Sequence, residues 1–166
     1  VDSSDVVGFA EVTGDRNPIH LSEHFAAKTP FGTRIAHGLY TASLISAVLG
    51  TRLPGPGAVY ISQTLNFRAP VKIGDTVQVS VSVAELMPEK CRARLTCSCV
   101  VDGEIALDGE AWVKVPSRAA GGESACSESP NLPAASPSAS SPVASTASNR
   151  LEVTVPRTTA SSRSTA

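Results

Sequence analysis

The stretch from Gly14 to His20, GDRNPIH, holds the densest group of chemically capable side chains in this 166-residue chain. Asp15 and His20 are separated by an Asn17-Pro18 pair, which restricts the backbone. A carboxylate accepts a proton, and an imidazole accepts or donates one near neutral pH, so the two can add or remove water. Asp and Asn also form ordinary turns by bonding their own backbone. Spacing alone therefore leaves a polar turn and a catalytic site equally open.

Two short helices are predicted on either side of this stretch. Residues 3–12 begin with capping-type residues, carry apolar side chains at helical spacing and stop at Gly14, a favoured helix terminator. Asn17-Pro18 predicts a turn. Ser22 is suited to cap a second helix that runs to Ala27, so we expect that helix to begin after His20.

A third helix, apolar on nearly all sides, is predicted over residues 35–49 and ends at Gly50 and the PGPG run of 54–57. Such a helix belongs in an interior. After residue 57 the hydrophobic period changes to two, which predicts antiparallel strands within 59–68, 77–83, 93–101 and 105–115. Asp102-Gly103 predicts a hairpin between the last two. One helix sheathed by a single curved antiparallel sheet is an α+β arrangement.

The last third of the chain has a different composition. Residues 117–166 contain no Phe, Tyr, Trp or Met and are dominated by Ser, Ala, Pro and Thr. We predict a disordered tail there, because such a segment buries too little apolar surface to offset its ordering entropy. The strand-like island 151–156 is isolated and is assigned to this tail. The folded domain is predicted to be residues 1–116.

Charge and cysteine usage exclude several classes of protein. The formal net charge of −1 gives no general attraction to nucleic acid or anionic membranes. The apolar run at 35–49 is too short to span a bilayer, and no signal-peptide pattern opens the chain, so we expect a cytoplasmic protein. The four cysteines lack the paired spacing of zinc sites. Cys97 and Cys99 are predicted to face one side of a strand as small core residues.

Other polar residues have plainer interpretations. His20 and His24 are four apart and could share a metal, but no third ligand has suitable spacing, so no metal site is predicted. His37 is expected to form a local hydrogen bond rather than to take a direct part in catalysis. Three basic residues could meet the phosphates of a nucleotide-containing substrate but are expected to be solvated charges: Lys28, Arg34 and Lys72.

The segment FAEVTGDRNPIH (9–20), followed by Ala26, resembles the signature of the (R)-specific enoyl-CoA hydratases of the MaoC-like hot-dog superfamily. The resemblance covers essentially all of residues 1–116 and none of the tail. It continues through IAHGL (35–39), SLISAVLG (43–50), LPGPG (53–57), PVKIGD (70–75) and GEAWVKVP (109–116).

The resemblance implies a hot-dog fold and a homodimer whose active sites lie near the subunit interface. It implies that Asp15 and His20 are catalytic and hold the water that adds to C3 of a trans-2-enoyl-CoA, while a proton reaches C2. The product would be an (R)-3-hydroxyacyl-CoA, formed reversibly and without a cofactor, in fatty-acid or polyhydroxyalkanoate metabolism.

Three further residues match family positions: Asn17, Gly38 and Ser46. Asn17 would help to hold the shape of the motif. Gly38, at the start of the apolar helix, would present its backbone N–H to the thioester oxygen, where negative charge builds during the reaction. Ser46, further along the same helix, would belong to the substrate pocket. Leu49, on the same helix, is expected to contact the acyl chain of the substrate.

Several alternatives remain open at this point. The same fold could act as a 3-hydroxyacyl dehydratase on acyl-carrier-protein thioesters or as part of a larger multidomain protein. It could also bind acyl thioesters without turnover, or hydrolyse them as a thioesterase. Family members usually have a further strand before the first helix, whereas this sequence starts at about that helix. We therefore expect an open sheet edge.

Overall fold

The computed structural model describes residues 1–116 and 150–154, which form four α-helices, a short 3-10 turn at Pro88–Lys90 and six strands. None of the helices in these ranges is long and apolar enough to cross a membrane. The helices are α1 (Ser3–Thr13), α2 (Pro18–Leu21), α3 (Glu23–Ala26) and α4 (Gly38–Thr51). The strands are β1 (Val59–Gln63), β2 (Asn66–Phe67), β3 (Gln78–Met87), β4 (Arg92–Val101), β5 (Glu104–Lys114) and β6 (Arg150–Thr154).

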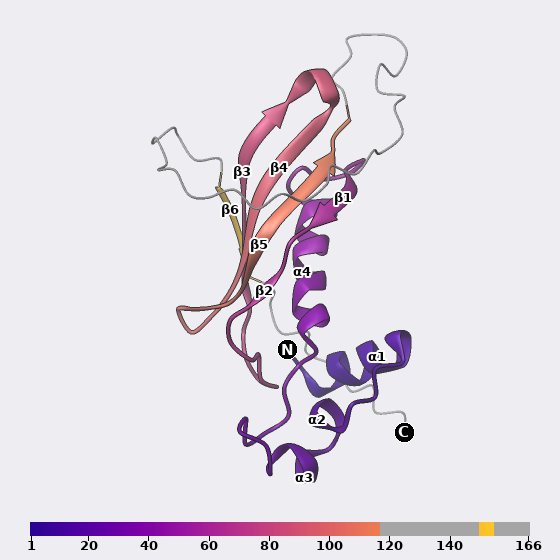
Figure 1. Ribbon diagram of the computed structural model, residues 1–166, viewed down its shortest axis with the longest axis vertical. Coiled ribbons are helices and arrows are strands. Elements are labelled where there is room, and N and C mark those ends of the chain that lie inside the picture. Colours follow the sequence, from indigo (N-terminus) through magenta and orange to yellow (C-terminus); the bar gives the residue numbers. More distant parts are fainter. Residues whose placement is uncertain (117–149, 155–166) are drawn as a thin grey trace, which may run out of the picture.

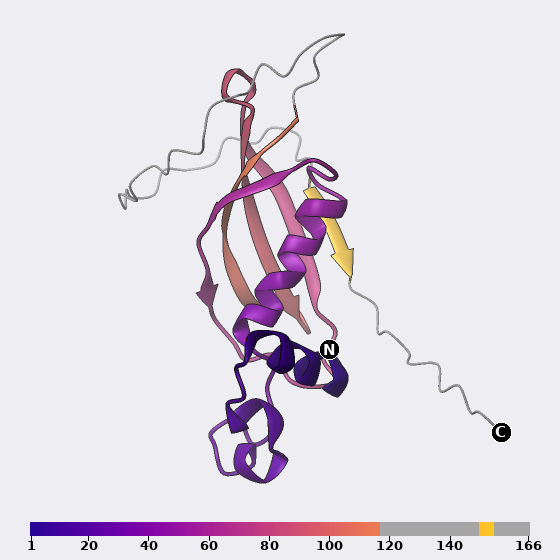
Figure 2. The same ribbon diagram turned by 90° about the vertical axis from the view of Figure 1, so that its right-hand side faces the viewer.

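The strands form one antiparallel sheet in the order β1-β5-β4-β3-β6, with β2 paired to β5 beside β1. The sheet curves, and α4 lies against one of its faces (Figures 1 and 2). The three short helices gather at the N-terminal end of α4 (Figure 1). The predicted α+β arrangement of one helix against a curved antiparallel sheet is confirmed.

The core lies between α4 and the covered face of the sheet. Period-two alternation turns every second side chain of β3 and β4 toward the helix. Ile45 of α4 is fully buried there, as are Val79, Val81 and Leu95. Cys97 and Cys99 are free thiols in the same layer, so their predicted core role is confirmed. Burial raises the pKa of Cys97 to about 11 and that of Cys99 to about 12.

Helix α4 is not buried on all sides, contrary to the sequence prediction. One face packs on the sheet, whereas Leu39 on the opposite face is 61% exposed. The helix also begins three residues later than predicted. Ile35 forms an isolated β-bridge with Lys72, and the Ala36 amide donates to the Val71 carbonyl, so these residues are extended rather than helical. This strand-like pairing positions the Ile35 carbonyl beside the site described below.

The predicted strand over 59–68 is divided into β1 and β2. Between them the Thr64 amide donates to the Glu110 carbonyl at 2.9 Å, and the Thr64 hydroxyl accepts from the Glu110 amide at 2.9 Å. A Cβ on Gly109 would collide with the Thr64 carbonyl oxygen. The close crossing of these two backbones therefore requires glycine at 109.

The island near the end of the chain was predicted to be disordered, and for residues 150–154 that prediction is wrong. They form β6, which pairs antiparallel with β3 from Gln78↔Thr154 to Ser82↔Arg150. The strand lies at the β3 edge of the sheet (Figure 1), whereas the sequence predicted an open edge without indicating which strand would form it. A strand-forming segment joined to a free ladder edge gains backbone hydrogen bonds, which local composition does not reveal. The rest of the predicted tail, 117–149 and 155–166, lies outside the described residues.

Candidate active site

The segment from Gly14 to Ser22 is shaped by short-range hydrogen bonds. Gly14 adopts φ 78°, and its amide donates to the Ala10 carbonyl, which ends α1 as predicted. The Asp15 carboxylate accepts from the Asn17 amide at 3.2 Å, and the Asn17 side chain accepts from the Ile19 amide at 3.2 Å. Asn17 is thus the N-cap of α2, with Pro18 in the first turn, so the predicted turn is present.

His20 lies within α2, a short helix that the sequence did not predict and that starts with Pro18 at its first position. Ser22 caps α3 by accepting from the Phe25 amide, as predicted. The break between α2 and α3 separates His20 from His24, which is exposed and contacts Lys28 at 2.9 Å. The His20–His24 pair considered as metal ligands therefore does not form.

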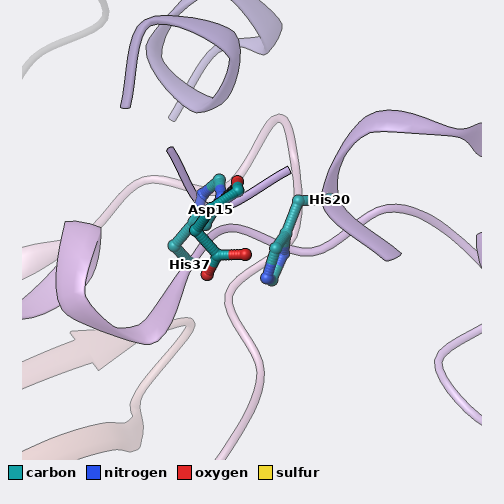
Figure 3. Close-up of side chains that lie close together, drawn as sticks. All are labelled: Asp15, His20 and His37. Atoms are coloured by element: carbon teal, nitrogen blue, oxygen red, sulfur yellow. Dashed lines mark hydrogen bonds between the residues drawn. The ribbon is translucent and has the colours of Figure 1, made fainter. Parts of the chain in front are cut away.

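Three side chains from different elements meet instead. Asp15 follows α1, His20 belongs to α2, and His37 is the N-cap residue of α4. One ligand atom from each lies within 4.8 Å of the others, so the three could together offer a metal ion a carboxylate oxygen and two ring nitrogens. Figure 3 shows the Asp15 carboxylate turned toward the His20 ring. Both imidazoles are buried, whereas Asp15 is exposed.

The hydrogen bonds of the two rings fix which nitrogen carries a proton. His20 Nδ1 lies 2.8 Å from the Ile35 carbonyl, and His37 Nε2 lies 3.0 Å from the Asp15 carbonyl. A carbonyl oxygen only accepts, so each of these nitrogens is the donor. In a neutral His20 ring, Nε2 then has a free lone pair that can accept a proton. The arrangement is suited to general acid–base chemistry on a small molecule beside Asp15.

A cavity of about 290 Å³ adjoins the cluster and contains His20 and Gly38 in its wall. Gly38 is the first residue of α4, so its amide has no acceptor within the helix. A Cβ at this position would lie 2.8 Å from the Phe67 ring. Glycine therefore allows close approach on this side of the cavity. A helix N-terminus also favours negative charge on a bound oxygen.

The sequence did not single out most of the cavity wall, which comes from segments far apart in the chain. Phe31 precedes α4, Phe67 and Arg68 follow β1, and Ala106 and Leu107 belong to β5. The pairing of β2 with β5 and a hydrogen bond from the Arg68 amide to the Ala106 carbonyl bring Phe67 and Arg68 beside the β5 residues. Periodicity marks such residues as apolar, but it does not show which of them line a cavity.

Arg68 is part of the cavity wall and forms an ion pair with Asp108. Its Nε lies 2.9 Å from a carboxylate oxygen of Asp108. Hydrogen bonds from Arg68 and Asn66 lower the pKa of Asp108, because they favour its charged form. The pKa of Arg68 is raised by the same hydrogen bond.

The remaining predicted residues lie away from the cavity. Ser46 is exposed on α4, and Leu49 is a 2% exposed core residue on the same helix. Neither is part of the cavity wall. Among the basic residues, Lys28 contacts His24, and Arg34 pairs with Glu23 at 3.3 Å. Lys72 is exposed, and its amide donates to Asp75.

Known proteins resemble this chain over the same region. The protein-family model described as a MaoC-like domain matches residues 1–100. A 3-hydroxybutyryl-CoA dehydratase of Methylorubrum extorquens is 80% identical over 118 residues, which are 71% of this chain and 75% of that protein. An (R)-specific enoyl-CoA hydratase of Rhodospirillum rubrum is 52% identical over 118 residues, covering 71% of this chain and 82% of the relative.

Solved structures agree with the sequence relatives. The (R)-hydratase from Aeromonas caviae involved in polyhydroxyalkanoate biosynthesis superimposes with a TM-score of 0.68 at 43% identity, covering 69% of this chain and 88% of its own. The R-hydratase PhaJ1 from Pseudomonas aeruginosa gives a TM-score of 0.68 at 42% identity, covering 82% of this chain and 84% of its own. The fold is therefore the hot-dog fold, and the chain belongs to the MaoC-like domain family.

Proposed function

We propose that this chain is an (R)-specific enoyl-CoA hydratase, a hydro-lyase that adds water to trans-2-enoyl-CoA and removes it from (R)-3-hydroxyacyl-CoA. The observation that carries the proposal is the convergence of Asp15 and His20 beside a cavity that also contains Gly38. The names of the relatives at 80% and 52% identity support the same reaction in its two directions.

The proposed mechanism uses Asp15 and His20 to hold one water molecule. The water oxygen forms a bond to C3 of the enoyl thioester as His20 Nε2 accepts one of its protons. The π electrons of the C2–C3 bond move toward the thioester oxygen, where the Gly38 amide stabilises the charge that builds. C2 then takes a proton back from the catalytic pair, which completes the addition of water.

The wall of the cavity supports an acyl thioester as the substrate. Apolar side chains such as Phe31, Phe67 and Leu107 suit an acyl group, and His20 and Gly38 supply the polar groups. This combination of an apolar lining with a few placed polar groups is typical of small-molecule sites. We assign no cofactor to the reaction, because a general base, a general acid and a backbone donor provide every proton and charge that it moves.

We also propose that the active form is a homodimer. Leu39 on the free face of α4 is 61% exposed, and Val59 of β1 is 58% exposed. Pairing of two chains would bury apolar surface of this kind. Light scattering should give a mass of twice 17.1 kDa. A mass of 17.1 kDa at the concentration that supports activity would contradict the dimer but not the reaction.

The reaction is tested by adding crotonyl-CoA to the purified chain and following the ultraviolet absorbance of the enoyl thioester. We expect the absorbance to fall to an equilibrium value, with no free thiol released. The Asp15→Asn variant provides the control for the site. Thiol release would indicate a thioesterase, and tight binding without loss of absorbance would indicate a non-catalytic binding domain. A much faster rate on crotonyl-acyl-carrier protein would indicate that the substrate is an acyl-carrier-protein thioester and not a CoA thioester.

A further inference from the structure

His37 is buried against the candidate catalytic pair without lining the cavity. Its side chain is 2% exposed, and the next residue, Gly38, belongs to the cavity wall whereas His37 does not. His37 therefore lies behind the reacting groups. A local hydrogen bond, which the sequence predicts for this residue, does not describe its contacts, because they reach Asp15 and His20 across 22 and 17 positions of the chain.

Two reciprocal hydrogen bonds join the catalytic segment to the residues before α4. The His20 ring donates to the Ile35 carbonyl, and the His37 ring donates to the Asp15 carbonyl. The other bonds of the Asp15 backbone and carboxylate are local, to Thr13 and Asn17. The bond from His37 thus fixes Asp15 relative to the helix that carries Gly38.

His37 also fixes the plane of the His20 ring. The two ring centroids lie 3.9 Å apart with an interplanar angle of 32°. Phe9 packs near His37, with ring centroids 5.0 Å apart. The His37 ring is therefore held between Phe9 and His20. Rotation of His20 about its side-chain bonds would break this packing and the bond to Ile35 together.

One ring nitrogen of His37 is left without a partner. Nδ1 is a buried nitrogen with no hydrogen bond among the described residues. A buried polar atom of this kind costs free energy, so its retention calls for an explanation other than stability. An apolar aromatic ring would fill the same space without that cost, but it could not donate to Asp15.

We propose that His37 is a positioning residue for the hydratase reaction: its Nε2–H sets the place of Asp15, and its ring sets the plane of His20. This inference rests on the proposed function. It assigns His37 no contact with the substrate. Loss of its interactions should therefore lower kcat and leave KM nearly unchanged, because the groups that bind the thioester stay in place.

The test uses three variants that separate the two contacts. His37→Gln keeps an N–H donor at the level of Nε2 and loses the ring, His37→Phe keeps the ring and loses the donor, and His37→Ala loses both. His24→Gln is the matched control, because His24 is exposed and, among the described residues, its ring hydrogen-bonds with Lys28 and not with the catalytic pair. Each is assayed on crotonyl-CoA, with thermal unfolding measured in parallel.

We expect His37→Ala to lower kcat by about a hundredfold with KM changed less than about threefold. His37→Gln should recover part of that loss, and His24→Gln should match the wild type. A folded His37→Ala variant with wild-type kcat would overturn the proposal, as would a loss confined to KM. Failure of all three His37 variants to fold would also overturn it, by making the role purely structural.

A readout that does not depend on turnover separates this proposal from the proposed function. Nitrogen-15 NMR of the imidazole of His20 reports which ring nitrogen carries the proton. We expect wild-type protein to show one fixed tautomer protonated at Nδ1, and His37→Ala to show a mixture. An unchanged His20 spectrum in His37→Ala would contradict the positioning role even if the wild type has no activity on crotonyl-CoA.

Discussion

The catalytic segment, residues 14–22, and the layer formed by α4 with the sheet hold their side chains by different means. Asp15 is exposed and depends on hydrogen bonds from Asn17 and His37. Ile45 and Leu95, by contrast, are fully buried between helix and sheet. The segment keeps polar groups at a defined place with little apolar burial, whereas the layer gains its stability from packing.

This difference separates the residues expected to control activity from those expected to control stability. Gly38 belongs to both regions, because it begins the packed helix and also lines the cavity. Substitutions in the catalytic segment should therefore lower activity and leave stability nearly unchanged, and substitutions in the layer should do the reverse. Substitution at Gly38 tests the residue that the two regions share.

Asp15→Asn and His20→Ala should have the largest effect, and it should fall on activity. Each removes a group that holds water or moves its proton, so kcat should fall by about a thousandfold. The midpoint of thermal unfolding should change little for Asp15→Asn, since this side chain is exposed. The measurement is crotonyl-CoA hydration together with circular dichroism. Wild-type rates in both variants would refute the assignment of the site.

Leu95→Ala should instead lower the stability of the fold and leave activity nearly unchanged. Leu95 is fully buried on β4, and loss of its side chain should lower the free energy of unfolding by about 2–5 kcal/mol. At a temperature where the variant is folded, kcat should stay close to that of the wild type. Leu86→Ala is the matched control, because Leu86 is 61% exposed on β3. Equal loss of stability in both would contradict the described core.

Gly38→Ala should affect the point where the two regions meet. The new Cβ would lie 2.8 Å from the Phe67 ring, so the ring, which also lines the cavity, must shift. We expect kcat/KM for crotonyl-CoA to fall by about tenfold or more, with stability changed by less than about 1 kcal/mol. The control is Gly50→Ala in the same helix, where a Cβ meets nothing within 4 Å. A comparable loss of kcat/KM in the two variants would contradict a specific role for Gly38 in the site.

The smallest effect is expected at the edge strand β6. Val153→Pro removes a backbone donor from the strand that pairs with β3, so it should lower the midpoint of unfolding by a few degrees. Hydrogen exchange at residues 78–82 of β3 should become faster. Val153→Thr keeps the donor and a β-branched side chain and should behave as the wild type. Unchanged exchange in Val153→Pro would show that the pairing contributes nothing in solution.

The sequence predicted the elements whose signals are local. Gly14 ends α1 with a left-handed backbone, and Asp102-Gly103 forms the hairpin turn with φ of 49° and 86°. Cys97 and Cys99 alternate with polar residues and are buried, as the period of two requires. Asp15 and His20 were identified from spacing and resemblance, and the structure brings them together.

The features that the sequence missed depend on contacts between distant segments. Helix α4 starts later than predicted because Ile35 pairs with Lys72. The predicted strand over 59–68 is divided in two because the backbone at Thr64 passes close to Gly109. His37 looked like a local helix-start residue, although its contacts are with Asp15 and His20. No local pattern encodes such pairings. The sequence placed Gly38 near the start of the apolar helix but did not show how the histidine before it packs.

The stereochemistry of the product tests the central claim most directly. Asp15 and His20 lie close together, and His20 and Gly38 both belong to the cavity wall, so we expect the held water to be delivered to one face of the double bond. Hydration of crotonyl-CoA by the wild-type chain, followed by chiral analysis, should give (R)-3-hydroxybutyryl-CoA. A racemic or (S) product, or no hydration by the folded protein, would contradict the account.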